Sequence, residues 1–208
     1  SGTRIQAIVA ELGRPDGTIL VSRWERVGAR FEGLDWLVPT DAVPGALAAL
    51  VAGDVPTGEP APAPAEVLVC GHGARDRCCG GAGTRLGVEV RAALGGEVRV
   101  RRTSHLGGHR FAPTALTLPD GRMWAFLDAE AVVDIVARRM APAEARELYR
   151  GNVALDPWAQ VLEGEVLADS GWGAVDFDEV EGTTAVDGDR ATVELRWTAG
   201  GRTDERTG

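Results

Sequence analysis

The chain has 208 residues, 44% of them hydrophobic and 25% charged, and its net charge is −9. This length allows one domain with a full hydrophobic core, and the composition is that of a globular chain. The negative charge argues against a nucleic-acid partner and against an anionic membrane surface. No apolar run approaches the ~18 residues that a membrane-spanning helix needs. No signal peptide is recognisable, so we expect a cytoplasmic protein.

The first part of the chain is predicted to form a small β extension. Residues 4–11 and 18–24 are strand candidates, and the Pro15-Asp16-Gly17 segment between them is typical of a turn. Residues 43–52 have spaced apolar side chains, which favours a short helix that ends at Gly53. The stretch 56–65, rich in Pro and Ala, indicates a linker or an extended surface loop.

The central part carries a strand–helix–strand pattern that is followed by a hairpin and a helix. Residues 66–70 form an apolar run typical of a buried strand, residues 84–94 have helical spacing, and residues 97–103 alternate. Residues 114–127 predict a hairpin with an Asp-Gly turn, and Asp128 is a suitable N-cap for a helix over 128–140. This order is found in thioredoxin-like folds, so we predict an α/β fold of that kind.

The last third is predicted to be an appendage of helices and a β-hairpin. Residues 141–149 and 156–167 are expected to be helical, and the chain after Trp172 is rich in strand formers. The Asp187-Gly188 pair marks the turn of the hairpin. We predict that the last eight residues are disordered.

The three Cys and two of the three His lie in two short loops. The first loop spans residues 70–79 and the second spans residues 104–113. Between them they contain Cys70, Cys78, Cys79, His105 and His109. Each loop follows the C-terminal end of a predicted strand, where sites assemble in open α/β sheets. Thiolate and imidazole ligands suit either zinc or an iron–sulfur cluster.

The spacing of these residues favours a cluster over zinc. Structural zinc sites usually use Cys pairs with about two to four intervening residues, whereas residues 71–78 separate Cys70 from Cys79. A loop of that width is better suited to wrap a cluster. Gly107 and Gly108 lie between the two His, and each Gly costs a helix about 1 kcal/mol relative to Ala. A helical His pair of the zinc-hydrolase type is therefore not expected.

Both loops resemble the sucrase/ferredoxin-like family, also called thioredoxin-like ferredoxins. Its pattern has two Cys with His-Gly and Arg-Asp between them, followed by two His. The matching residues here are Cys70, His72, Gly73, Arg75, Asp76, Cys79, His105 and His109. Tyr149-Arg150-Gly151 and Gln160 also resemble the family, and the likeness is strongest over residues 66–128.

The resemblance implies a 2Fe–2S cluster with Cys70, Cys79, His105 and His109 as ligands. It also implies a thioredoxin-like ferredoxin domain over residues 1–140, including the β extension, with the helix and β-hairpin appendage over 141–208 packed on it. We therefore predict an electron carrier for one-electron transfer rather than an enzyme. Neutral His ligands raise the potential of a cluster, and a ligated imidazole keeps one N–H, so we expect reduction to be coupled to His protonation.

Further residues are predicted to surround the ligands: His72, Gly73, Arg75, Asp76, Cys78, Gly108 and Pro113. Cys78 competes with its neighbour for one ligand position, and the spacing favours Cys79. Glycines let the backbone approach closely, so that their N–H groups can donate to cluster sulfur. Pro113 is expected to follow a cis peptide bond, as the proline that faces the site in thioredoxin-like folds often does.

Three other functions stay open at this point. The site could be a structural zinc module, or it could be a cluster that senses redox state or iron and controls partner binding. A thiol oxidoreductase using Cys78 and Cys79 is the third, but it lacks the usual C-x-x-C spacing. For an electron carrier we expect an unidentified reductase or oxidase as partner. The acidic C-terminal part either offers a docking surface for it or covers one sheet edge. Both a monomer and a homodimer fit the sequence.

Overall fold

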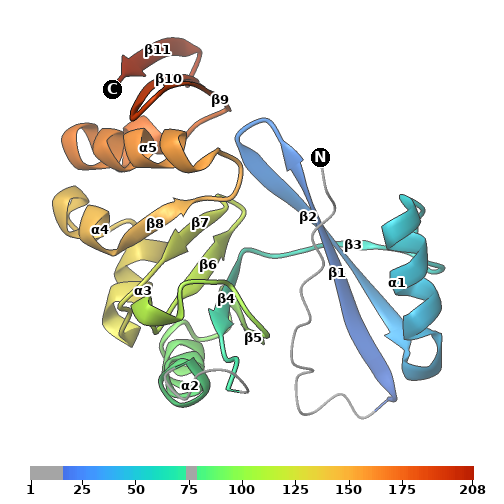
Figure 1. The fold of residues 1–208 in the computed structure, drawn as a ribbon. Coiled ribbons are helices and arrows are strands. Elements are labelled where there is room, and N and C mark those ends of the chain that lie inside the picture. The colour runs from blue at the N-terminus through green and yellow to red at the C-terminus, as the bar shows by residue number, and fades with distance from the viewer. Residues whose placement is uncertain (1–15, 74–78) are drawn as a thin grey trace.

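The computed structural model of the chain describes residues 16–73 and 79–208. Within these ranges the strands form three sheets, and the helices pack between and around them in a mixed α/β arrangement (Figure 1). The fold is therefore α/β, as predicted. None of the described helices is long and apolar enough to cross a membrane.

The N-terminal sheet is built on a long hairpin. Its strands are β1 (Thr18–Val27), β2 (Arg30–Pro39) and the short β3 (Ala61–Pro62). A single 3₁₀ turn, η1 (Thr40–Ala42), leads into α1 (Val43–Ala52), which packs its Ala46 against Trp36 of β2. The helix ends where Gly53 adopts a left-handed φ of 85° and caps it.

The prediction of this region is partly confirmed. The strand over 18–24 and the helix over 43–52 are present, and the strand predicted over 4–11 lies outside the described residues. Strand β2 was not predicted, because Gly33 interrupts its apolar pattern. The structure shows why a glycine is needed at position 33, since a Cβ there would lie only 2.8 Å from the ring of Trp24 on the neighbouring strand.

The central sheet has five strands in the order β5-β4-β6-β7-β8. They are β4 (Glu66–Cys70), β5 (Arg99–Thr103), β6 (Ala115–Leu118), β7 (Arg122–Trp124) and β8 (Tyr149–Asn152). Strand β4 is parallel to β5 and antiparallel to β6, while β6 and β7 form a hairpin. The predicted strands over 66–70 and 97–103 and the predicted hairpin over 114–127 are confirmed.

One face of the central sheet carries the main core. Helices α2 (Thr84–Ala93) and α3 (Ala129–Val136) pack Leu86 and Val132 against Val67 and Val69 of β4. Figure 1 shows these helices on one side of the sheet and the N-terminal hairpin on the other. The predicted helix over 84–94 and the N-cap are confirmed, because the Asp128 side chain accepts a hydrogen bond from the Ala131 N–H.

The end of α3 differs from the prediction, which carried the helix to residue 140. The helix stops at Val136, and Arg138 adopts a positive φ of 55°, which the right-handed helix does not allow. The Arg138 side chain then turns to Asp176 and donates a hydrogen bond of 3.1 Å to Oδ1. This hydrogen bond is the main reason why the pKa of Asp176 is lowered.

The C-terminal part contains helices α4 (Pro142–Leu148) and α5 (Pro157–Ser170), a 3₁₀ turn η4 (Trp172–Val175), and strands β9 (Glu179–Asp187), β10 (Arg190–Ala199) and β11 (Arg202–Thr207). The two helices and the turn at Asp187-Gly188 were predicted. The prediction that the last eight residues are disordered is wrong. Strand β11 pairs with β10 along its whole length, so the appendage carries a three-stranded sheet instead of a hairpin.

The polar sequence of β11 explains this error, since charged residues and threonines without any apolar residue are typical of a solvated tail. Strand β11 is stabilised by backbone hydrogen bonds to β10, and its side chains carry no pattern that predicts this pairing. The short polar strand β8 was not predicted either. It pairs with β7, so the segment 141–208 contributes the edge strand of the central sheet.

A buried ionic network joins the N-terminal sheet to the central sheet. Glu66, at the start of β4, is 0% exposed, and its carboxylate accepts hydrogen bonds from Arg99 (2.9 Å, Nη2 to Oε2) and Arg101 (2.7 Å, Nη2 to Oε2). Arg99 also donates to Asp35 of β2, and Arg101 donates to the Ser22 hydroxyl of β1 at 3.0 Å. Burial lowers the pKa of Arg99, but the hydrogen bonds to the two carboxylates outweigh this and raise it.

We expect Glu66→Gln to lower the free energy of unfolding by about 3–5 kcal/mol, because it leaves the buried Arg101 and the half-buried Arg99 with one carboxylate fewer. The measurement is chemical denaturation followed by tryptophan fluorescence. Glu25→Gln is the matched control, because Glu25 pairs with Arg23 at the surface and its side chain is 62% exposed. We expect this variant to lower the free energy of unfolding by less than about 1 kcal/mol. Equal losses in the two variants would contradict the role of the buried network.

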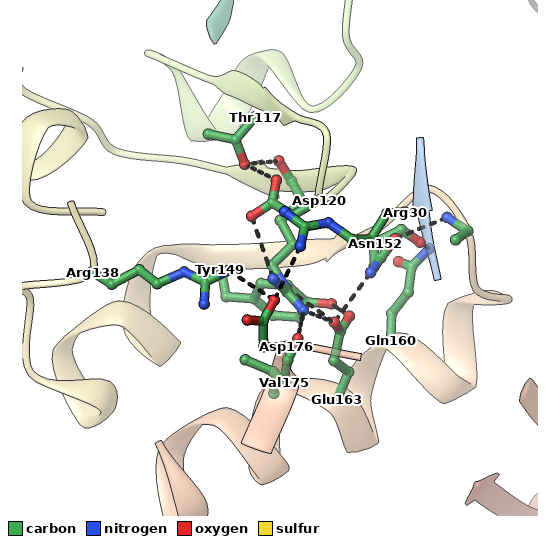
Figure 2. A network of polar contacts seen from close by, with 12 residues as sticks. Arg30, Thr117, Asp120, Arg138, Tyr149, Asn152, Gln160, Glu163, Val175 and Asp176 are labelled. Atoms are coloured by element: carbon green, nitrogen blue, oxygen red, sulfur yellow. Dashed lines mark hydrogen bonds and ion pairs between the residues drawn. The ribbon is translucent and has the colours of Figure 1, made fainter. Parts of the chain in front are cut away.

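A second buried network fastens α5 to the central sheet, as Figure 2 shows. Arg122 of β7 donates to Glu163 of α5 through Nε at 3.0 Å and Nη2 at 2.8 Å, both to Oε1. Asn152 of β8 donates to the same oxygen at 3.1 Å, and the Tyr149 hydroxyl donates to Oε2. Burial and the nearby Glu163 carboxylate raise the pKa of Tyr149 well above its ordinary value.

The raised pKa of Tyr149 predicts a loss of stability at alkaline pH. The neutral phenol is present below the unfolded-state pKa of about 10, and its contribution is lost as pH rises from there towards the folded-state value. We expect Tyr149→Phe to lower the free energy of unfolding by about 1–3 kcal/mol at neutral pH. Above pH ~10 the free energy of unfolding of the variant should decline less steeply than that of the wild-type chain. Denaturation curves at several pH values check this, and an unchanged alkaline decline in the variant would contradict it.

Candidate functional site

The two loops with the predicted ligands begin side by side at the carboxyl ends of β4 and β5. These strands are parallel neighbours, and their last residues, Cys70 and Thr103, are paired. The Gly71 N–H donates to the Thr103 carbonyl at 3.0 Å, and the Cys70 N–H donates to the Thr114 carbonyl at 3.0 Å. Both loops therefore leave the sheet from adjacent, hydrogen-bonded points, which is the edge where α/β folds assemble sites.

The thiols of Cys70 and Cys79 are buried in one small apolar cluster. Cys70 is 1% and Cys79 is 2% exposed, and Leu106 completes the buried part of the cluster. Cys79 begins a short π-helical turn, η2 (Cys79–Gly83), which runs directly into α2. Because Leu106 belongs to the second loop, the structure brings both predicted Cys ligands and the His-bearing loop together.

Glycines allow the two ends of the first loop to pack backbone against backbone. A Cβ at Gly83 would lie 1.9 Å from the Cys70 carbonyl oxygen, and a Cβ at Gly80 would lie 2.5 Å from the Cα of Gly73. Real Cβ atoms do not approach that closely, so these positions exclude any side chain. The close approach sets the separation between the two Cys-bearing segments.

Two of the three imidazoles lie close to each other. His105 is exposed, and its ring centroid is 5.6 Å from that of the half-buried His72 in an edge-to-face arrangement. His72 Nδ1 is buried and finds no hydrogen-bond partner among the described residues. His109 begins the 3₁₀ turn η3 (His109–Phe111), and the position of its side chain lies outside what the structure describes.

The residues predicted to surround the ligands are described only in part. Arg75, Asp76 and Cys78 lie outside the described residues. The Ala112–Pro113 peptide bond is cis, as predicted. Gly108 has a φ of +65°, and a Cβ there would lie 3.0 Å from the Phe111 ring. Among the described side chains, no three His, Cys, Asp or Glu residues gather closely enough to hold a single metal ion.

Sequence reasoning did not identify the residues that hold η3 in place. The Arg150 guanidinium carbon lies 5.3 Å from the ring centroid of Phe111 and 5.2 Å from that of Phe126, and the two rings meet edge to face at 5.7 Å. The Phe126 N–H donates to the Phe111 carbonyl at 2.9 Å. The Tyr149-Arg150-Gly151 motif marked Arg150 as a residue of interest, but only the paired strands show that it reaches the second loop.

The contact between the loop ends generates a test. We expect Gly83→Ala to lower the free energy of unfolding by about 1–3 kcal/mol, because the backbone at Cys70 has to shift to admit the methyl group. Gly81→Ala is the matched control, since Gly81 lies in the same turn and a Cβ there would meet nothing within 4 Å. We expect the control to be neutral or slightly more stable. Both are measured by chemical denaturation, and equal behaviour would contradict the close approach.

Comparison with known families gives one finding for this chain. The family model described as sucrase/ferredoxin-like matches residues 9–151, which is more than half of the chain and includes both loops. Searches of curated proteins and of solved structures find no match.

Proposed function

Because the chain belongs to the sucrase/ferredoxin-like family, we propose that it is an electron-transfer protein whose 2Fe–2S cluster is bound by Cys70, Cys79, His105 and His109. The observation that carries the proposal is the burial of two thiols from separate segments in one cluster that the His-bearing loop closes. Thiolate with imidazole is a donor set that binds iron–sulfur clusters.

The described residues fit such a group. Each iron would take two protein ligands, so the site needs two pairs of side chains and does not require three to converge on one point. The Cys pair is buried, and Leu106 lies against it. The unpartnered Nδ1 of His72 is a buried polar atom beside the ring of His105. Buried polar atoms usually have a hydrogen-bond partner, and we expect this one to find its partner in the loaded site.

The strand order supports the thioredoxin-like interpretation of the central sheet. In that interpretation, β4-α2-β5 is the parallel strand–helix–strand unit, and β6-β7-α3 is the hairpin and helix that follow it. The cis Pro113 precedes β6 and therefore lies near the site. The extra strand β8 and the N-terminal sheet are additions to this unit.

The proposed mechanism divides the work between buried and exposed residues. When bound, the cluster supplies a one-electron site whose potential is raised by its neutral His ligands. Cys70, Cys79 and Leu106 are buried, so they would exclude water from a bound cluster. His105 is exposed, so solvent would reach the ring nitrogen that is not used to hold iron. We therefore propose that reduction is coupled to protonation of a His ligand.

The partner in this proposal is a cytoplasmic reductase or oxidase that exchanges one electron with the site. A reducing compartment suits cysteines that serve as metal ligands instead of forming disulfides. The chain needs no substrate of its own for this function.

The test is anaerobic purification with a visible spectrum and with iron and acid-labile sulfide assayed on the same sample. We expect a red-brown protein with about two iron and two sulfide per chain, as a 2Fe–2S cluster requires. Cys70→Ser and Cys79→Ser should lose most of both. Cys78→Ser is the matched control and should keep them, because the eight-residue spacing of the family pattern selects Cys79.

Two outcomes would contradict the proposal. A colourless protein with about one zinc per chain would replace it with a structural zinc module. Loss of iron in Cys78→Ser with retention in Cys79→Ser would leave the cluster in place but overturn the ligand assignment.

A further inference from the structure

The hydroxyl group of Thr114 is buried without a partner next to the candidate site. Thr114 is 3% exposed, and its Oγ1 finds no hydrogen-bond partner among the described residues. A buried hydroxyl without a partner costs about 1–3 kcal/mol. Valine has nearly the same shape and would avoid this cost, so the hydroxyl at this position calls for a physical reason.

The register of the central sheet places Thr114 opposite Cys70. The last paired residues of β4 and β6 are Val69 and Ala115, so the next position brings Cys70 and Thr114 together. The hydrogen bond from the Cys70 N–H to the Thr114 carbonyl continues the ladder there. Directly opposed residues of an antiparallel pair project from the same face of the sheet, with Cβ atoms about 5 Å apart.

The packing identifies this face as the one that carries the thiols. Side chains two residues apart on a strand share a face, so Leu116 projects on the same side as Thr114. Leu116 packs against the cluster of Cys70, Cys79 and Leu106. Thr117, by contrast, projects on the opposite side, where its hydroxyl donates to Asp120 at 2.6 Å and accepts from Trp124 Nε1 at 3.0 Å.

We propose that the Thr114 hydroxyl donates a hydrogen bond to a sulfur atom of the loaded site. This hydrogen bond would raise the reduction potential of the cluster. This inference rests on the proposed function. The acceptor is a sulfur atom that carries negative charge, either the Cys70 thiolate or an inorganic sulfide. In the described structure Oγ1 makes no hydrogen bond to the Cys70 thiol or to any other group, so its proton is available.

The direction of the effect follows from charge. Reduction adds one negative charge to the site, and part of it resides on sulfur. A donor that points at sulfur stabilises the reduced form more than the oxidised form, since hydrogen bonds strengthen with the charge of the acceptor. Removing the hydroxyl should therefore favour the oxidised form and lower the potential.

The experiment compares the reduction potentials of the wild-type chain, Thr114→Val, Thr114→Ser and Thr117→Val by spectroscopic redox titration at one pH. We expect Thr114→Val to shift the redox equilibrium about tenfold toward the oxidised form, which is about 59 mV for one electron. Thr114→Ser keeps the hydroxyl and should rescue the potential. Thr117→Val, in the strand that directly follows Thr114, is the matched control, and it should lower stability without moving the potential.

A second measurement does not depend on how well the variants load. Resonance Raman spectra of the wild-type chain in H₂O and D₂O should differ in the Fe–S stretching region, because the hydroxyl proton exchanges. Absence of an isotope shift in the wild-type chain would overturn the inference even if Thr114→Val did not fold.

The outcomes separate this inference from the proposed function. A loaded chain in which Thr114→Val and Thr117→Val have the same potential would overturn the role of Thr114 and leave the cluster assignment intact. A wild-type chain without iron and sulfide would overturn both. A potential lowered in Thr114→Val and restored in Thr114→Ser supports both.

Discussion

Strand β4 is buried along its whole length and hydrogen-bonded on both sides, and the rest of the structure is organised around it. Val67 and Val69 point to the helices, where they form the centre of the main core. Glu66 and Cys70 are an even number of residues apart, so both project on the opposite face. Glu66 anchors the N-terminal sheet through two arginines, and Cys70 brings a thiol to the candidate site. A shift of this strand by one residue would exchange the two faces and disrupt both.

The segment after residue 140 contributes a strand to the central sheet in addition to the helices that pack around it. Its strand β8 presents three consecutive residues to three different neighbours. Tyr149 donates to Glu163 of α5, Arg150 lies over the two phenylalanine rings beside the second loop, and Gly151 leaves room for Gln160, whose Oε1 would lie 2.0 Å from a Cβ there. This explains physically why the Tyr-Arg-Gly motif and the glutamine of α5 occur together. The strand connects the C-terminal helix to the edge of the candidate site.

Local patterns identified most of the elements that hold the site. The apolar run over 66–70, the helical spacing over 84–94, the Asp-Gly hairpin and the cap at Asp128 are each encoded by neighbouring residues, and each is present. Strands β2, β8 and β11 were missed for a common reason. A glycine interrupts the pattern of β2 and β8, and β11 has no apolar residue. All three strands are stabilised by pairing with another strand. The sequence carries no local signal for such pairing.

The sequence by itself determined the candidate ligands, since the spacing of Cys70, Cys79, His105 and His109 is a property of the chain, and it also determined the family. Only the tertiary structure decided what surrounds them. The opposition of Thr114 to Cys70 depends on the register between β4 and β6, and the position of Arg150 over Phe111 depends on β8 joining the sheet edge. Register and strand order arise from many distant contacts acting together, so they become visible only once the sheet has formed.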